Sequence, residues 1–103
     1  MKKYELIPKV TNRKSFYKKA YVIEIAPDVY QLQSYQTIVC EVYHGKFRRF
    51  WNDYSATTMT HINDFIALFN IPGGGKKWWL EQPVEKYTDH ITDQIENYNK
   101  LYA

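Results

Sequence analysis

The stretch QSYQTIVCEVYHGKFRRFWNDYSATTMTHINDFIALF, residues 33–69, decides the fold. Apolar and polar side chains alternate on both sides of His44 and Gly45, which is typical of two strands joined by a tight turn. Gly tolerates positive φ, and two-residue loops match the twist of paired strands. Such a turn places Tyr43 opposite Lys46 and fixes every pair farther from the turn. The stretch therefore predicts an antiparallel hairpin.

This register divides the side chains of the hairpin between two faces. It pairs Ile38 with Trp51 and Val39 with Phe50. One face is expected in the core and carries Ile38, Cys40, Val42, Phe47 and Trp51. Arg49 lies among them and must reach the rim, find an acid or serve a ligand, because a buried unpaired charge is costly. The other face combines rings, cations and one cross-strand ion pair, and it carries Tyr35, Thr37, Val39, Glu41, Tyr43, Lys46, Arg48 and Phe50.

An amphipathic helix is predicted after the hairpin. Hydroxyl side chains between Ser55 and Thr58 are suited to cap its free backbone N–H groups. Apolar residues then recur at helical spacing and predict a face packed on the sheet: Met59, Ile62, Phe65, Ile66 and Phe69. The polar residues between them are expected toward the flank or solvent: Thr60, His61, Asn63 and Asp64.

The rest of the chain supplies further strands and a last helix. Residues 3–10 are weakly strand-like, and Pro8 favours an edge strand or an extended arm. Residues 21–25 alternate as a strand does, and a turn follows at Pro27 and Asp28. Residues 29–33 form another short strand, which we expect to continue past a bend at Ser34 into the hairpin.

Pro83 is expected at the first position of the last helix, where its missing N–H costs nothing. The apolar stripe of that helix would be Tyr87, Ile91, Ile95, Tyr98 and Tyr102. These elements predict an α+β fold: an antiparallel sheet of about four strands with two or three helices packed on one face. At 103 residues the chain is long enough for one core, so residues 1–103 are expected to form a single domain.

From the composition we expect a cytoplasmic protein. The single cysteine, Cys40, excludes an internal disulfide and suits a buried apolar position on its strand. No run of residues approaches membrane-spanning length, and the N-terminal lysines precede no apolar segment. Aromatic residues make up 17% of the chain, so some Tyr and Trp are expected at the surface.

Charge is unevenly distributed along the chain. Residues 1–51 contain ten Lys and Arg against four Asp and Glu, whereas residues 52–103 contain four against seven. The balances are +6 and −3, which add up to the net charge of +3. A basic half attracts phosphate backbones or an acidic protein surface, and the alternative is a solvated surface without a partner.

No pattern of catalytic or metal-binding residues is recognisable, so we expect no enzyme, no metal and no cofactor. The three histidines lie at no metal-ligand spacing. Ser55, Thr57 and Thr58 lack the surroundings of a nucleophile, and capping explains them most simply. With His61 they are also a candidate anion site, because hydroxyls and free N–H groups at a helix start bind anions.

Three blocks carry a resemblance to a family: SFYKKA at residues 15–20, SYQTIV at residues 34–39 and YSATT with His61, Ile62 and Phe65 after it. The chain resembles an uncharacterised family of small proteins encoded by phages, prophages and other mobile elements of Firmicutes. In that family the first block often reads SFYGKA and a basic residue often precedes the histidine; here Lys18 and Thr60 stand in those places. The resemblance implies a binding protein of a bacterial host's cytoplasm, without a transferable activity.

Two functions follow as expectations. The first is a small non-enzymatic protein that engages nucleic acid, with cations on phosphates and rings on bases. The residues expected to bind are Lys18, Lys19, Tyr35, Tyr43, Lys46, Arg48, Arg49 and Phe50. The alternative is a protein-binding inhibitor or adaptor, such as an anti-defence (anti-CRISPR-like) protein acting on a host complex. A homodimer through the last helix is expected if the other helix does not cover the sheet.

Overall fold

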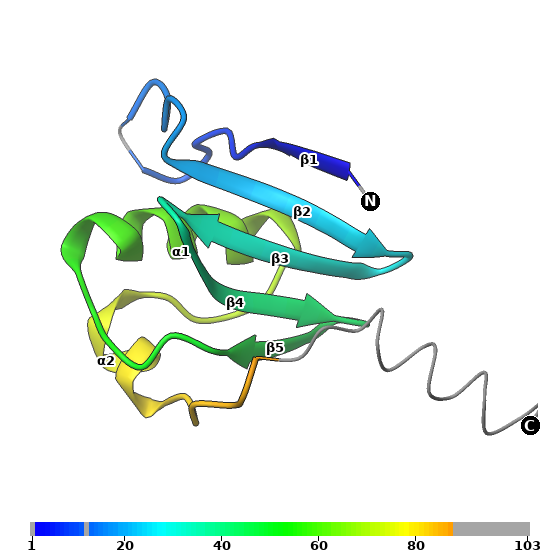
Figure 1. Ribbon diagram of the computed structural model, residues 1–103. Coiled ribbons are helices and arrows are strands. Elements are labelled where there is room, and N and C mark those ends of the chain that lie inside the picture. The colour runs from blue at the N-terminus through cyan, green and yellow to red at the C-terminus, as the bar shows by residue number, and fades with distance from the viewer. Residues whose placement is uncertain (1, 12, 88–103) are drawn as a thin grey trace, which may run out of the picture.

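The computed structural model of the protein describes residues 2–11 and 13–87, in which five strands precede two helices (Figure 1). The strands are β1 (Lys2–Glu5), β2 (Ala20–Ala26), β3 (Val29–Ser34), β4 (Thr37–Tyr43) and β5 (Lys46–Arg49). The helices are α1 (Ala56–Leu68) and α2 (Gly75–Glu81). All strands join one antiparallel sheet in sequence order, and the helices pack on it. The α+β prediction is confirmed, with five strands in place of about four.

The core lies between the sheet and the helices. Val22, Leu32 and Cys40 face each other across β2, β3 and β4, and all three are fully buried. Phe65 of α1 and Trp79 of α2 pack against this row. Burial of apolar side chains from both layers is the main force that holds α1 and α2 on the sheet. Burial also raises the pKa of the Cys40 thiol, as expected for a buried apolar cysteine.

Helix α1 begins where its hydroxyl residues predict. Ser55 is the N-cap, and its Oγ accepts a hydrogen bond of 3.1 Å from the backbone N–H of Thr58. The predicted apolar stripe is confirmed, because Met59, Ile62, Phe65 and Ile66 are buried. The prediction for two polar residues of α1 is wrong: His61 and Asp64 are both buried.

The register predicted for the hairpin is confirmed through four pairs, from Tyr43 with Lys46 to Cys40 with Arg49. It fails beyond them, because the N–H groups of Phe50 and Trp51 both donate to the Val39 carbonyl.

A bulge in the pairing of β3 with β4 also changes which residues face the core. Val39 is unpaired and packs in the core, whereas Ile38 pairs with Gln33 and shares its outer face. The predicted faces of Ile38 and Val39 are therefore reversed.

Two predicted connections are wrong. The chain does not bend at Ser34 and continue; it reverses at Tyr35 and Gln36, with Tyr35 at a φ of 54°, so that β3 and β4 form a second hairpin. Pro83 does not begin a helix, because residues 83–87 are not helical and Val84 forms a bridge with Arg49 of β5. The remainder of the expected last helix lies outside the described residues.

Arg49 is buried beneath the helices with 4% of its surface exposed. Its guanidinium donates to backbone carbonyls instead of a carboxylate: Nε to Trp51 at 2.9 Å, Nη1 to Trp79 at 3.1 Å and to Gln82 at 3.2 Å. It also lies over the Trp79 ring, 4.5 Å from the centroid. Arg49 therefore joins β5 to the C-terminal end of α2, where carbonyl groups lack helical partners.

Replacing this guanidinium should destabilise the fold strongly. We expect Arg49→Met to lower the free energy of unfolding by about 3 kcal/mol or more, because it leaves several buried carbonyls without a donor. Lys46→Met, an exposed change on the same strand, should cost less than about 0.5 kcal/mol. Urea unfolding followed by circular dichroism measures both, and equal small losses would contradict a structural role for Arg49.

Candidate functional site

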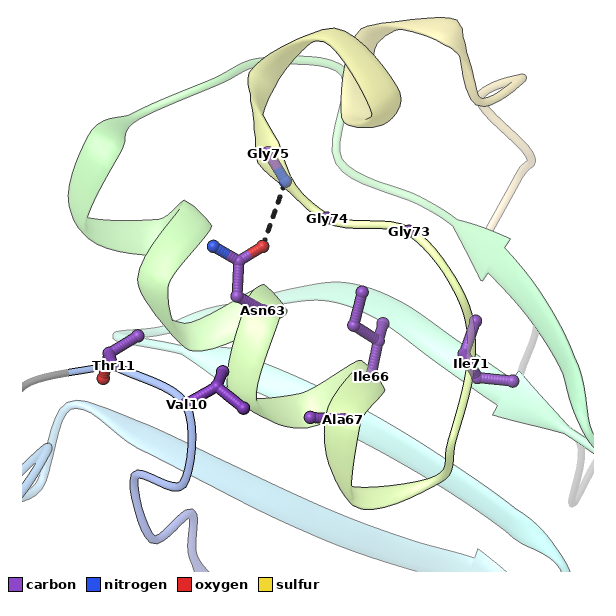
Figure 2. A pocket seen from close by; sticks show the side chains of 9 residues that line it. All are labelled: Val10, Thr11, Asn63, Ile66, Ala67, Ile71, Gly73, Gly74 and Gly75. Atoms are coloured by element: carbon purple, nitrogen blue, oxygen red, sulfur yellow. Dashed lines mark hydrogen bonds between the residues drawn. The ribbon is translucent and has the colours of Figure 1, made fainter.

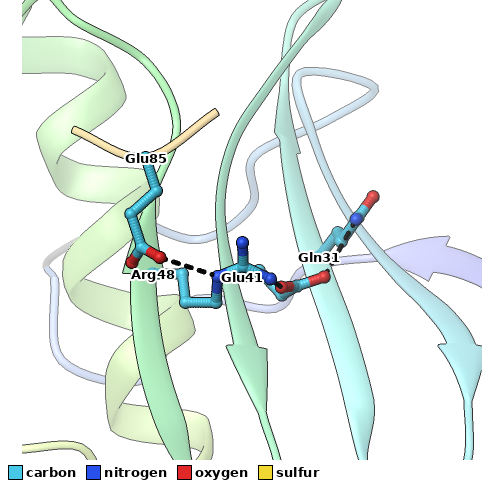
Figure 3. Close-up of polar contacts among 4 residues, drawn as sticks. All are labelled: Gln31, Glu41, Arg48 and Glu85. Atoms are coloured by element: carbon cyan, nitrogen blue, oxygen red, sulfur yellow. Dashed lines mark hydrogen bonds and ion pairs between the residues drawn. The ribbon is translucent and has the colours of Figure 1, made fainter. Parts of the chain in front are cut away.

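The outer face of the sheet holds a buried polar network rather than an open basic surface (Figure 3). Glu41 is fully buried and accepts hydrogen bonds from Gln31 Nε2 at 3.1 Å and from Arg48 Nη1 at 3.0 Å. Arg48 Nε also binds Glu85 Oε1 at 3.2 Å. The predicted cross-strand ion pair is confirmed. Two carboxylates offset the charge of Arg48, which weakens it as a phosphate contact.

The remaining residues predicted for this face do not form one continuous surface. Tyr43 and Lys46 lie at the His44 turn, whereas Tyr35 lies at the opposite end of β4. The length of a seven-residue strand, about 20 Å, separates the two groups. Phe50 is half-buried, and Arg48 lies over its ring at 5.2 Å. Arg49 faces the core and is not available to a ligand.

Lys18 and Lys19 instead belong to a basic surface at the end of the sheet near Tyr35. We call residues 13–19 the basic loop; its exposed cations are Arg13, Lys14, Lys18 and Lys19. Two rings accompany them: Tyr17 is 67% exposed and Tyr35 is 46% exposed. Within residues 2–11 and 13–87, none of these four cations forms an ion pair. They are therefore available to an anionic partner.

Backbone hydrogen bonds hold the basic loop in place. The Tyr35 N–H donates to the Lys19 carbonyl at 2.7 Å, and the Lys18 N–H donates to Glu5 Oε1 at 2.6 Å. Lys18 has a φ of 52°, in the left-handed region that glycine adopts without a steric penalty. A glycine would adopt this turn without strain, and Lys18 adds a charge to the loop.

The candidate anion site is occupied by internal hydrogen bonds. Ser55 caps Thr58, and the Thr58 hydroxyl lies 3.0 Å from the Ser34 hydroxyl. Ser34 Oγ also lies 2.8 Å from His61 Nδ1. Ser34 and His61 are 3% and 1% exposed, so solvent and ligands do not reach them. The Thr57 carbonyl accepts a hydrogen bond from the Thr60 hydroxyl. This group links β3 to α1.

Burial changes the protonation of His61. Desolvation, with smaller effects from the charges of Arg13 and Lys19, lowers its pKa from 6.5 to about 4, against an opposing effect of Asp64. His61 is therefore neutral near pH 7, and its ring packs edge-on against Phe16 of the basic loop at 4.7 Å.

Asp64 is a structural residue that the helical pattern did not indicate. Its Oδ1 accepts hydrogen bonds from the N–H groups of Lys9 and Val10, the latter at 2.7 Å. These bonds join the segment after β1 to α1. The partners are more than 50 residues apart in sequence. Only long-range contacts, which periodicity does not report, distinguish Asp64 from a solvated helical aspartate.

A pocket of about 390 Å³ lies between α1 and the loop that contains Gly73, Gly74 and Gly75 (Figure 2). Asn63 Oδ1 accepts a hydrogen bond of 3.1 Å from the Gly75 N–H. A Cβ at Gly74 would lie 2.9 Å from the same Oδ1, so this glycine permits the close approach of loop and helix. No charged side chain lines the pocket, whose lining consists of Val10, Thr11, Asn63, Ile66, Ala67, Ile71, Gly73, Gly74 and Gly75. Gly74 therefore serves packing.

The described residues limit two other kinds of site. Among them, no group of three His, Cys, Asp or Glu side chains is placed to hold a metal ion. Neither α1 nor α2 has the length and apolar character needed to cross a bilayer.

The fold and the site define a small α+β protein with an exposed basic loop at one end of its sheet. The chain belongs to a family of unknown function, DUF8033, whose model matches residues 4–81. This match confirms the expected membership of an uncharacterised family and includes all three sequence blocks. No curated protein and no solved structure matches the chain.

The lowered pKa of His61 predicts a pH-dependent stability. Both folded and unfolded chains hold a neutral His61 above pH 6.5, but between pH 6.5 and 4 only the unfolded chain takes up the proton. Stability should therefore fall as the pH falls through this window, by about 3 kcal/mol in all.

Urea unfolding at several pH values, with His61→Asn as the test variant, isolates this effect. The variant is expected to lose the part of the pH dependence that belongs to His61. Asn52→Ala, at an exposed side chain that does not titrate, should keep the wild-type dependence. Equal pH dependence in the wild type and His61→Asn would show that His61 does not carry the effect.

Proposed function

We propose that the protein is a small non-enzymatic nucleic-acid-binding protein of a phage or another mobile element, acting in the cytoplasm of a bacterial host. The observation that carries this proposal is the basic loop, where four exposed cations lie beside two exposed tyrosines. Cations contact phosphates and tyrosine rings stack on bases, so the combination suits nucleic acid better than a small anion.

The position of the binding surface follows from the charges that remain available. Arg48 is paired with Glu41 and Glu85, and Arg49 is buried. Lys18, Lys19 and Tyr35 are the sequence-predicted residues that lie at the basic loop. The proposed surface is therefore the end of the sheet, not its outer face.

The non-enzymatic part of the proposal is supported by the surroundings of the reactive side chains. Ser34 and His61 lie within hydrogen-bond distance, as a nucleophile and its base do. Both are buried. Ser34 contacts the Thr58 hydroxyl, and the His61 ring packs against Phe16. A substrate would have to displace packed side chains to reach them.

A protein partner is the second candidate function, in which the protein is an inhibitor or adaptor, such as an anti-defence protein that binds a host complex. Ile7 and Val10 favour it, because they are 73% and 62% exposed on the arm that follows β1. Trp79 is buried in the core and contributes nothing to such a surface. A photo-crosslinking residue at position 7 that captured one stoichiometric partner would support this function.

The mobile-element context rests on the three sequence blocks. Gene neighbourhood tests it and separates the two functions. Adjacent replication genes support nucleic-acid handling, whereas adjacent anti-defence genes support the inhibitor.

Removal of one loop charge should weaken nucleic-acid binding without loss of stability. Lys18→Gly removes a cation at a left-handed position, and we expect a gain of about 0.5–1 kcal/mol in stability from relief of backbone strain. If Lys18 contacts a phosphate, affinity for oligonucleotides should fall several-fold and the slope of log K against log salt should decrease by about one.

Fluorescence anisotropy of labelled single- and double-stranded oligonucleotides at 50 and about 200 mM salt measures this effect. Lys46→Ala removes an exposed cation at the other end of β4 and should leave affinity unchanged. Binding that is undetectable, or that does not respond to salt, would overturn the proposed function.

A further inference from the structure

A second pocket, of about 400 Å³, lies at the outer side of the sheet beside the β3–β4 turn. We call it the aromatic pocket; its lining consists of Gln36, Thr37, Ile38, Phe50, Trp51, Asn52 and Tyr87. The pocket is a shallow depression that is open to solvent rather than an enclosed cavity. Three of the seven lining residues are aromatic and two carry amides.

Three separate segments bring the rings of this pocket together. The N–H groups of Phe50 and Trp51 bind the Val39 carbonyl at 3.0 and 3.1 Å, which keeps the chain beyond β5 against β4. The Glu85 N–H donates to the Arg49 carbonyl at 2.7 Å, which brings the segment before Tyr87 to the same edge. The Tyr87 ring then meets the Phe50 ring edge-on at 5.4 Å. The β4 bulge adds the half-buried Ile38 to the floor.

The chemistry of the lining matches a nucleobase. The Tyr87 ring is 48% exposed and provides a stacking surface that accepts any base. Gln36 and Asn52 are exposed, and each amide offers both a donor and an acceptor, as the edge of a base does. Thr37 adds an exposed hydroxyl. A purely apolar ligand would leave these polar groups without partners.

The aromatic pocket and the basic loop flank the same turn. Gln36 follows Tyr35, and the Tyr35 N–H binds the Lys19 carbonyl. Figure 1 shows the loop before β2, the β3–β4 turn and the chain leaving β5 at one end of the sheet. A strand of nucleic acid whose phosphates lie on the basic loop therefore has a base-sized pocket within reach, on the other side of Tyr35.

We propose that the aromatic pocket holds an unpaired nucleobase and that the ligand of the basic loop is single-stranded nucleic acid. This inference rests on the proposed nucleic-acid-binding function and specifies its ligand. Bases in a duplex are stacked and paired, so their faces do not enter such a pocket, whereas a single strand can turn one base outward. The pocket thus supplies a preference for single strands and the loop supplies charge.

Variants at the exposed rim of the pocket test the inference. Tyr87→Ala removes one ring wall, and Asn52→Ala removes one amide. Binding of a labelled 12-nucleotide oligothymidylate should weaken about tenfold for Tyr87→Ala and about threefold for Asn52→Ala. Their salt slopes should equal that of the wild type, because neither variant removes a phosphate contact. Binding of a duplex of the same length should not change.

Tyr43→Ala is the matched control. Tyr43 is exposed to a similar degree as Tyr87, 38% against 48%, but lies at the opposite end of β4. Its replacement should change neither affinity, and urea midpoints verify that all three variants are folded.

The outcomes separate this inference from the function on which it rests. A single-strand preference that Tyr87→Ala and Asn52→Ala reduce supports the pocket. Equal binding of single strands and duplexes, salt-dependent and weakened by Lys18→Gly but not by the pocket variants, overturns the pocket and leaves the proposed function in place. Failure of every oligonucleotide to bind overturns both.

Discussion

The buried guanidinium of Arg49 is the interaction on which the arrangement of the second half of the chain depends. A charge beneath the helices is costly unless dipoles replace its water. Carbonyls of Trp51, Trp79 and Gln82 do so, and the Trp79 indole N–H in turn donates to the Asp53 carbonyl at 2.7 Å. The end of β5, the loop after it and the end of α2 therefore converge on one side chain, and none of the three can shift alone.

The adjacent Arg48 performs the corresponding task on the opposite face of β5. It joins Glu41 of β4 to Glu85 of the segment after α2. The same segment is also bound through Val84 and Glu85 to the backbone of Arg49. A four-residue strand at the edge of a sheet is thus covered by chain rather than left open. Two neighbouring arginines, on opposite faces because strand side chains alternate, hold this cover in place.

The sequence predicted what local chemistry determines. The hairpin at His44 and the cap at Ser55 depend on a few neighbouring residues, and both are confirmed. The turn at Tyr35 was missed because its left-handed residue is a tyrosine, not the glycine or asparagine that normally signals such a turn. The bulge at Val39 was missed because it depends on the pairing with β3, which is not encoded in the alternation of β4.

Long-range partners explain the other errors. His61 is buried by Ser34 and Phe16, and Asp64 by the N–H groups of Lys9 and Val10. A helical pattern places such polar residues on the solvated side because solvent is the commonest partner for them. Here other segments of the chain provide the partners, so periodicity alone gives the wrong environment.

Ion pairing, rather than strand alternation, separates the cations that the fold uses from those that remain exposed. The alternation placed Arg48 on the outer face and Arg49 among the core residues. Arg48 is paired with two carboxylates, and Arg49 is enclosed by carbonyls. The excess positive charge of residues 1–51 remains available in the folded protein only where carboxylates do not pair with it. Among residues 2–11 and 13–87, the exposed cations of the basic loop form no ion pair, so their charge is retained there. The basic loop is therefore the described region where the proposed anionic partner would meet positive charge without an ion-pair partner, beside the aromatic pocket.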